Sequence, residues 1–337
     1  MRYGILFIIL IIFANPLFAQ FGSDAFQALN LPLSSRLAVL NEPIALMDDD
    51  VEVGIVNPSM LNDQMNNQLS LNFVDYFSDI NFISASYAFP FKDFGTMGVS
   101  IKSIGYGEFV ETDIAAQNLG TFGANEQIIA VGLSKKLTDR WMVGASVKSL
   151  FSNFESYSST AVATDMSIAY YNIEKKFYMT MLAKHIGRQL TSFTSTTENL
   201  PLQLEFGMSK RLEHLPFRFM LGYKNIQQWD LTYTTENTTI DTNTTFLMDF
   251  SSNLFRHIDF GGELSLGKHL QLRMGYSPKR RQELKVNSFF GMVGFSWGIG
   301  VKFSHFKIDY GRSTYHLHGS PNYFSFSTDI SKFYRKK

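Results

Sequence analysis

Paired histidine and acidic residues are the side chains whose spacing is best suited to chemistry. His316 and His318 lie two residues apart, so on a strand both would share one face and could bridge a metal ion. His257 and Asp259 have the same spacing and could serve a hydrolase. The first pair lacks a third ligand nearby, and the chain contains neither Gly-x-Ser-x-Gly nor His-Glu-x-x-His. With no cysteine either, we predict no catalysis, no metal and no cofactor.

The charged residues point to a contact between two parts of the chain. Asp48, Asp49 and Asp50 form an acidic triplet near the N-terminus, and the Gly and distal Glu of a calcium loop are missing after it. Basic side chains occur on the polar faces of later segments, among them Arg218, Lys224, Arg273 and Lys302. We therefore hypothesise that residues 20–67 form an acidic plug in a partly basic lumen, with a solvated periplasmic tail as the alternative.

A dense basic group, Lys279, Arg280 and Arg281, falls in a predicted outer loop. Phosphate groups of anionic lipopolysaccharide would be a suitable counter-charge. Ordinary loop charge, balanced by Glu283, is the alternative interpretation.

From Leu69 onward, apolar residues recur at every second position, which is the period of a strand with two different faces. Segment 97–102 reads Met-Gly-Val-Ser-Ile-Lys, and segment 202–209 reads Leu-Gln-Leu-Glu-Phe-Gly-Met-Ser. A soluble sandwich could show the same alternation. The spacing of the connections favours a membrane barrel instead, because short turns alternate with longer links.

The alternation predicts about 14 strands in an all-β, antiparallel transmembrane barrel. They span 69–76, 80–89, 95–104, 124–136, 141–152, 161–172, 177–186, 202–210, 217–231, 255–266, 269–277, 288–297, 300–311 and 322–333. The longer links, 105–123, 187–201 and 232–254, become outer loops if both ends of the chain lie in the periplasm. We expect these loops to bind a protein partner, and the candidate residues are Tyr106, Phe109, Phe122, Trp229, Tyr233 and Phe246.

The N-terminus predicts export. Arg2 precedes an uncharged apolar run from Ile5 to Phe13, and the run ends before a plausible cleavage site after Ala19, as in a secretory signal peptide. The predicted organisation is a signal peptide over 1–19, a plug or hatch over 20–67 and a barrel over 68–337. The outer membrane and its lipid are the predicted surroundings. The 30 basic and 30 acidic residues leave no net basic charge for nucleic acid, so we predict no such partner.

Segment 48–73, with its Asp triplet, Asn57-Pro58-Ser59 and Asn67 to Phe73, resembles the start of the long-chain fatty-acid transporter-like barrels of Bacteroidetes. Further short segments resemble the PorV/PorQ-type barrels of the type IX secretion system over residues 24–330. These segments are Glu155 to Ser159, His185 to Leu190, Trp229 to Tyr233, Arg280 to Leu284 and Tyr310 to His316. Their order carries the resemblance, since each segment alone is short.

The resemblance implies a hatch before 14 strands and a role in the complex that attaches secreted cargo to anionic lipopolysaccharide. In that role the barrel would hold a surface protein of the PorZ type, and another subunit would cleave the cargo. One departure is the end of the chain, where Arg335, Lys336 and Lys337 follow the aromatic pair Phe333 and Tyr334. The rival interpretation is an outer-membrane transporter of hydrophobic small molecules such as fatty acids.

Overall fold

The computed structural model describes residues 25–32, 34–41, 45–92, 94–194, 196–231, 246–284, 291–315 and 319–334. The predicted signal peptide, Tyr233 and the pair His316 and His318 lie outside these residues, as does the side chain of Phe246. Within the described part of the chain, no helix is long and apolar enough to cross a membrane.

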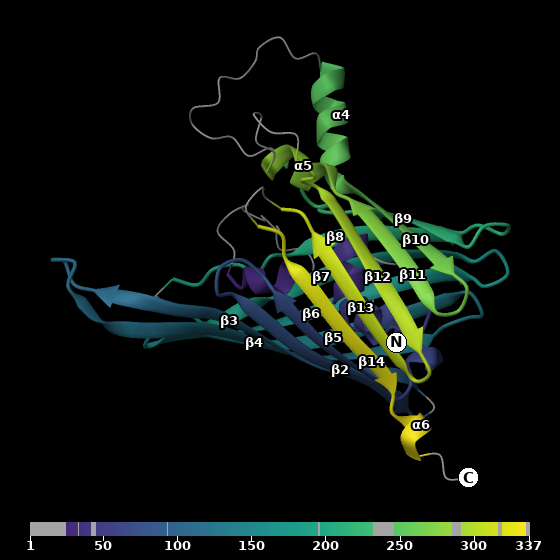
Figure 1. Cartoon of the computed structure of the whole chain (residues 1–337), viewed down its shortest axis with the longest axis horizontal. Helices are drawn as coiled ribbons and strands as arrows, with labels where there is room; N and C mark the ends of the chain where they lie inside the picture. The colour runs from purple at the N-terminus through teal and green to yellow at the C-terminus, as the bar shows by residue number, and fades with distance from the viewer. Residues whose placement is uncertain are drawn as a thin grey trace, which may run out of the picture.

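Fourteen antiparallel strands close into a barrel (Figure 1), which confirms the predicted fold class. Each strand pairs with its neighbours in the sequence, and β1 pairs with β14 to complete the ring. The strands are β1 (Gln68–Asp75), β2 (Asn81–Phe91), β3 (Gly95–Thr112), β4 (Asn118–Lys136), β5 (Trp141–Phe154), β6 (Tyr157–Asn172), β7 (Phe177–Thr191), β8 (Gln203–Arg211), β9 (Phe217–Tyr223), β10 (Ile258–Leu266), β11 (Leu270–Tyr276), β12 (Phe295–Phe303), β13 (Phe306–Ser313) and β14 (Asn322–Asp329).

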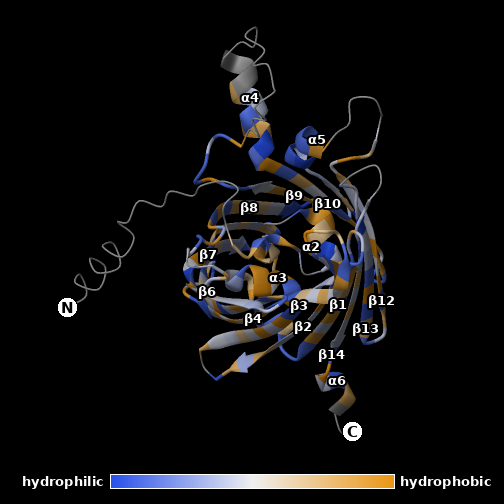
Figure 2. Ribbon diagram, turned by 90° about the vertical axis from the view of Figure 1, so that its left-hand side faces the viewer, coloured by the Kyte–Doolittle hydropathy of each residue, from blue (hydrophilic) through white to orange (hydrophobic). Residues whose placement is uncertain are grey.

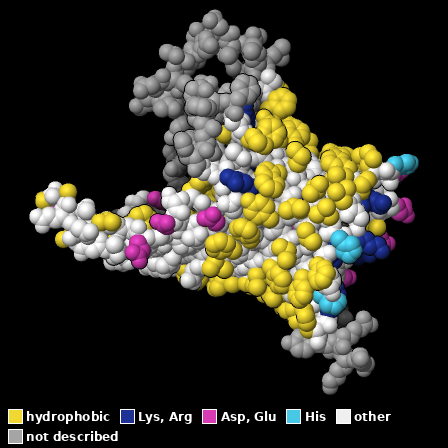
Figure 3. Space-filling model, in the orientation of Figure 1, with side chains coloured by type: hydrophobic (Ala, Val, Ile, Leu, Met, Phe, Trp, Pro, Cys, Tyr) yellow, Lys and Arg dark blue, Asp and Glu magenta, His cyan; other side chains and the backbone are white. Residues whose placement is uncertain are grey.

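The alternation of the sequence sets the two faces of this wall. Ile101 is 47% exposed, whereas its neighbour Lys102 is 4% exposed, because successive side chains of a strand point to opposite faces. Hydrophobic side chains therefore gather over the outside of the barrel (Figure 3). A closed sheet leaves no backbone edge unpaired, so this apolar wall can lie in hydrocarbon.

Several boundaries differ from the predicted ones. The segments expected as strands over 288–297 and 300–311 are displaced: β12 begins at Phe295, and the turn to β13 lies at Ser304, whose φ is +52°. Apolar and aromatic residues continue through this region, so alternation alone could not locate the turn. Strand β9 ends at Tyr223 rather than at residue 231. Most of the expected loop 105–123 is strand, because β3 and β4 continue into a long hairpin.

Helices occur in the outer links, where none was predicted. Helix α4 (Phe246–His257) and helix α5 (Pro278–Leu284) precede β10 and β12 and stand together above the barrel in Figure 1. A short helix, α6 (Ser331–Tyr334), follows the last strand.

The N-terminal segment lies inside the ring of strands (Figure 2). It contains η1 (Gln27–Asn30), α2 (Ser35–Leu40), α3 (Val51–Val56), η2 (Pro58–Met60) and η3 (Asp63–Met65). Ser34 and Asp50 start the two α-helices, since their side chains accept hydrogen bonds from Leu37 N and Glu52 N. Helix α2 packs against β10 to β14, whereas α3 and η2 pack against strands of the other half.

Candidate functional site: the lumen around the N-terminal segment

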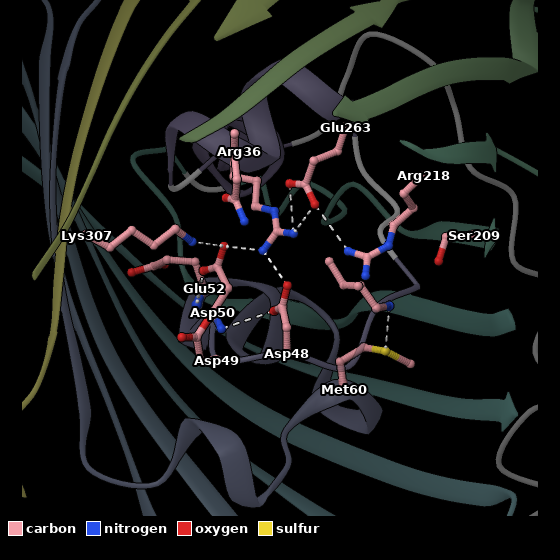
Figure 4. A network of polar contacts seen from close by, with 12 residues as sticks. Arg36, Asp48, Asp49, Asp50, Glu52, Met60, Ser209, Arg218, Glu263 and Lys307 are labelled. Carbon is pink, nitrogen blue, oxygen red and sulfur yellow. Dashed lines mark hydrogen bonds and ion pairs between the residues drawn. The ribbon is translucent and has the colours of Figure 1, made fainter. Parts of the chain in front are cut away.

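Arg36 of α2 is the centre of a buried charge network between the N-terminal segment and the wall (Figure 4). Its Nη1 lies 2.7 Å from Asp48 Oδ2 and 3.1 Å from Asp50 Oδ2. Its Nη2 lies 2.9 Å from Glu263 Oε2 on β10. Arg36 is 2% exposed, so these three carboxylates replace the water that the guanidinium loses on burial.

Glu263 joins this centre to two arginines of the wall. Arg218 Nη1 lies 3.2 Å from Glu263 Oε1, and Arg273 Nε lies 2.9 Å from Glu263 Oε2. Arg273 also donates to Asp309. The two arginines predicted to face an acidic plug therefore pair with acids of the wall, and Asp48 and Asp50 of the segment pair with Arg36.

The remaining predicted lumen residues lie at the edges of the network. Lys302 Nζ is 2.7 Å from Asp49 Oδ2, a pair between the wall and the N-terminal segment. Lys307 extends the contact, with Nζ 3.7 Å from Asp50 Oδ2. Lys224 instead pairs within the wall, 2.9 Å from Asp259 Oδ2.

Sequence reasoning missed Arg36, Glu263, Lys307 and Asp309. The strand residues among them occupy inward positions of the alternation, so their charge and face were readable from the sequence. What the sequence did not show was their closeness to Arg36, since 227 residues separate Arg36 from Glu263.

Glu52 of α3 is a buried acid next to this network. Asn72 Nδ2 on β1 donates to Glu52 Oε1 over 2.8 Å, while Oε2 has no hydrogen-bond partner. Burial, together with the nearby negative charge of Asp50, raises the pKa of Glu52 to about 7. This carboxyl therefore changes charge near neutral pH.

On the opposite side of the barrel, strands β5 to β7 hold the N-terminal segment through uncharged contacts. The backbone N–H of Ser59 donates to Ser167 Oγ over 2.8 Å, and Asn57 Nδ2 donates to Thr180 Oγ1 over 3.0 Å. Gly144 allows the approach, because a Cβ there would lie 2.1 Å from the carbonyl carbon of Pro58. Small residues on this wall let backbone pack directly on backbone.

Cavities lie at both ends of the segment. One of about 470 Å³ opens among the short turns at the end of the barrel where the last strand ends, and it is lined by Met47, Leu61, Phe94 and Met142, among others. Another of about 280 Å³ lies at the outer end, between Phe26 and the link that carries Phe193. The N-terminal segment thus stands between an inner and an outer space.

The predicted partner-binding residues fall into three places. Phe109 and Phe122 stack on the β3–β4 hairpin with ring centroids 5.4 Å apart, and Phe154 joins them. Tyr106 turns inward and packs against the core that contains Phe26. Trp229 lies beside α4, 5.0 Å from the ring of Phe250.

The basic residues predicted to bind lipopolysaccharide belong to α5 and contact the protein itself. Arg280 donates to Asn41 over 3.1 Å and lies over the ring of Tyr315. Arg281 donates to the carbonyl oxygens of residues 291 and 293. Burial lowers the pKa of Lys279. The structure places at least two of the three in contacts that stabilise the outer end of the barrel.

The pair considered for catalysis, His257 and Asp259, makes its contacts within the protein. Both ring nitrogens of His257 face backbone carbonyls, Nδ1 at 2.7 Å from Lys224 O and Nε2 at 3.0 Å from Trp229 O. The neighbouring Asp259 pairs with Lys224. In the residues that the structure describes, no group of three His, Asp or Glu side chains is placed to hold a metal ion.

The closed wall, its apolar exterior and its filled lumen define an outer-membrane β-barrel. Solved structures of the same fold include a deltaS2S3 mutant of the monoaromatic hydrocarbon channel TodX (TM-score 0.51, 11% identity, 88% of this chain and 99% of that one). The toluene transporter TodX of Pseudomonas putida (TM-score 0.50, 11% identity) covers 88% of this chain and 96% of its own.

A Pseudomonas aeruginosa FadL homologue is similar to the same degree, with a TM-score of 0.50, 11% identity, and coverage of 88% of this chain and 98% of that one. No protein-family model and no curated protein matches the sequence. The likeness therefore concerns the fold, and the narrower resemblance to PorV/PorQ-type barrels stays a prediction.

Proposed function

We propose that this outer-membrane barrel transports hydrophobic small molecules and that its N-terminal segment closes the path. The observation that carries the proposal is the position of this segment between the outer cavity and the periplasmic one. Phe26 and Phe193 line the outer space among mostly polar residues, and Leu61 and Met142 line the inner space in a lining of mixed polarity. Solved barrels of this fold are described as hydrocarbon channels, which supports the proposal at the level of fold.

Transport through the lumen requires the segment to move, and a reversible crosslink tests this. A Cβ at Gly311 would lie 2.7 Å from Ser35 Oγ and 2.7 Å from Val39 Cγ2, so Ser35→Cys and Gly311→Cys can form a disulfide once the Val39 side chain shifts. The chain has no other cysteine. In liposomes, we expect the oxidised double variant to lose toluene uptake and the reduced form to regain it.

The matched controls are the single variants Ser35→Cys and Gly311→Cys, which cannot crosslink within one chain. Uptake that is equal in the oxidised and reduced double variant would contradict movement of α2 during transport. Absence of uptake by the unmodified barrel would contradict transport itself.

A second candidate function is the attachment of a surface protein in the type IX secretion system, as the sequence resemblance implies. The supporting observation is the β3–β4 hairpin, which extends beyond the other strands in Figure 1. Its tip carries exposed apolar residues, Val110, Ile114 and Leu119, next to the stacked Phe109 and Phe122. An exposed apolar cluster of this kind is typical of a protein-binding surface.

Deletion of residues 108–121 tests the docking role. We expect the shortened barrel to insert and migrate as a folded protein, yet to lose a PorZ-type partner in a pull-down from cells. The crosslinked Ser35→Cys and Gly311→Cys variant serves as the control, because it leaves the hairpin intact. Partner recovery that is unchanged by the deletion would contradict the hairpin assignment.

A further inference from the structure

Three lysines and one histidine, all buried, line one cavity between the N-terminal segment and the barrel wall. None of them belongs to the Arg36 network. They are Lys102, Lys148, Lys184 and His185, and each is at most 8% exposed. Leu29, Leu31, Ile55 and Val56 of the N-terminal segment also line the cavity. Its volume is about 40 Å³, which is room for about three water-sized groups.

The lysines are held in place by named partners. Lys148 Nζ lies 2.5 Å from Asp165 Oδ2, and Lys184 Nζ lies 3.1 Å from Glu205 Oε1. Lys102 Nζ donates to the carbonyl oxygens of Ala28 and Leu31 over 3.0 and 2.8 Å.

His185 gives the cavity a donor of defined direction. Its Nδ1 lies 3.5 Å from Lys148 Nζ and 3.7 Å from Asp165 Oδ1. Because an ammonium group can only donate, the closer contact has Nδ1 as the acceptor and leaves the ring proton on Nε2. Nε2 is buried and has no hydrogen-bond partner. An unpaired buried N–H is costly, and an acceptor in the cavity would satisfy it.

The backbone is arranged to place this ring. His185 has φ +62°, the register between β6 and β7 shifts here, and the backbone N–H of His185 donates to Asp165 Oδ1 over 2.8 Å. The irregular wall turns the imidazole into the lumen beside two adjacent lysines. Such bulges commonly redirect a side chain next to a functional site.

We infer that this cavity binds an oxyanion of carboxylate size, which accepts hydrogen bonds from His185 Nε2 and from the lysine ammonium groups. The inference stands independently of transport. A carboxylate has four acceptor positions and no proton to donate at neutral pH, which matches a wall of donors. Lys184 also lines a second cavity toward the outside, together with Lys224 and Arg280, so basic groups continue from the outer end to the site.

The cavity volume of about 40 Å³ admits a small anion such as acetate and leaves no room for an acyl chain. Equilibrium dialysis of the purified barrel in non-ionic detergent, with radiolabelled acetate and with radiolabelled octanoate, tests this. Acetate binding that depends on His185 supports the site, and octanoate should bind no more tightly than acetate.

We expect His185→Leu to weaken binding roughly tenfold or more, since it removes one hydrogen bond to a charged group. His185→Gln, which retains an N–H donor near the position of Nε2, should stay within a few-fold of the unmodified barrel. A double variant, Lys184→Met with Glu205→Gln, removes a neighbouring donor without leaving a buried charge and should also weaken binding. Heat-dependent gel migration reports whether each variant is folded.

Two results would overturn the inference. One is the absence of saturable binding of both ligands to the folded, unmodified barrel. The other is equal binding by the unmodified barrel and folded His185→Leu, which would place the ligand elsewhere or in the detergent.

Discussion

The two halves of the barrel hold the same N-terminal segment by different physical means. On the side of β9 to β14, Arg36 of α2 is bound through buried ion pairs to Glu263 and to the acids of its own segment. On the side of β4 to β7, η2 rests on Gly144 and on neutral hydrogen bonds to Ser167 and Thr180. Charge fixes one end of the segment, and close backbone packing fixes the other.

This difference matters for any movement of the segment. A buried ion pair is costly to break on one side only, because a charge is then left without water or partner. Neutral hydrogen bonds and van der Waals contacts can be exchanged for water at much smaller cost. We therefore expect the half of the segment around η2 to leave the wall more readily than α2, and the following variants test this order.

The largest effect is expected for Arg36→Met. The change leaves Asp48, Asp50 and Glu263 buried around an apolar side chain and should destabilise the docked α2 by about 3–5 kcal/mol. Hydrogen exchange of peptide 34–41 in the folded barrel measures this, because it reports local opening. Arg36→Lys, which keeps the charge with fewer hydrogen bonds, should lie in between. Unchanged protection in Arg36→Met would contradict the central place of this residue.

Glu52 should give the next effect, in the form of a pH dependence. Its folded-state pKa of about 7 exceeds the ordinary 4.5, so the folded chain binds the proton more tightly than the unfolded chain. The stabilisation is complete below about pH 4.5 and is lost as the pH rises to about 7, a change of about 3 kcal/mol. Urea unfolding in lipid vesicles at pH 5 and pH 8 measures it.

Glu52→Gln is the matched variant, since it keeps the shape without the titration. The unmodified barrel should lose stability between pH 5 and pH 8 relative to Glu52→Gln. An equal pH dependence of the two would show that Glu52 is not the titrating group.

The sequence predicted the wall well because alternation is a local property of each strand. Lys102 and Ile101 reveal their faces from their immediate neighbours. The Arg36 centre is different, because it forms only after the ring closes and a helix enters it. The turn at Ser304 was misplaced for another reason: alternating residues on both sides permit more than one register.

Gly144→Ala should act on the other half of the segment. The new methyl group would overlap the backbone of Pro58 and Ser59, with Cβ distances of 2.1 and 2.3 Å, and we expect a cost of about 1–3 kcal/mol. Hydrogen exchange should increase in peptide 51–65 and stay unchanged in peptide 34–41. Gly132→Ala is the control, because its Cβ would meet Leu61 at an ordinary 3.4 Å. Equal exchange in both peptides would show that the segment moves as one unit.

The smallest effect is expected at Lys302, although its pair with Asp49 is the contact between segment and wall that the charge pattern suggested. Lys302 and Asp49 are 48% and 34% exposed, so water screens their attraction and the pair should contribute at most about 1 kcal/mol. A double-mutant cycle of Lys302→Ala and Asp49→Ala, measured by exchange of peptide 45–56, gives the coupling energy directly.

That coupling should fall further at high salt, whereas the effect of Arg36→Met should persist, because buried charges are screened much less. A coupling energy above about 2 kcal/mol would mean that the Arg36 network of strong ion pairs extends to Lys302 and Asp49. The contrast between α2, held by charge, and the rest of the N-terminal segment, held by weaker contacts, would then be wrong.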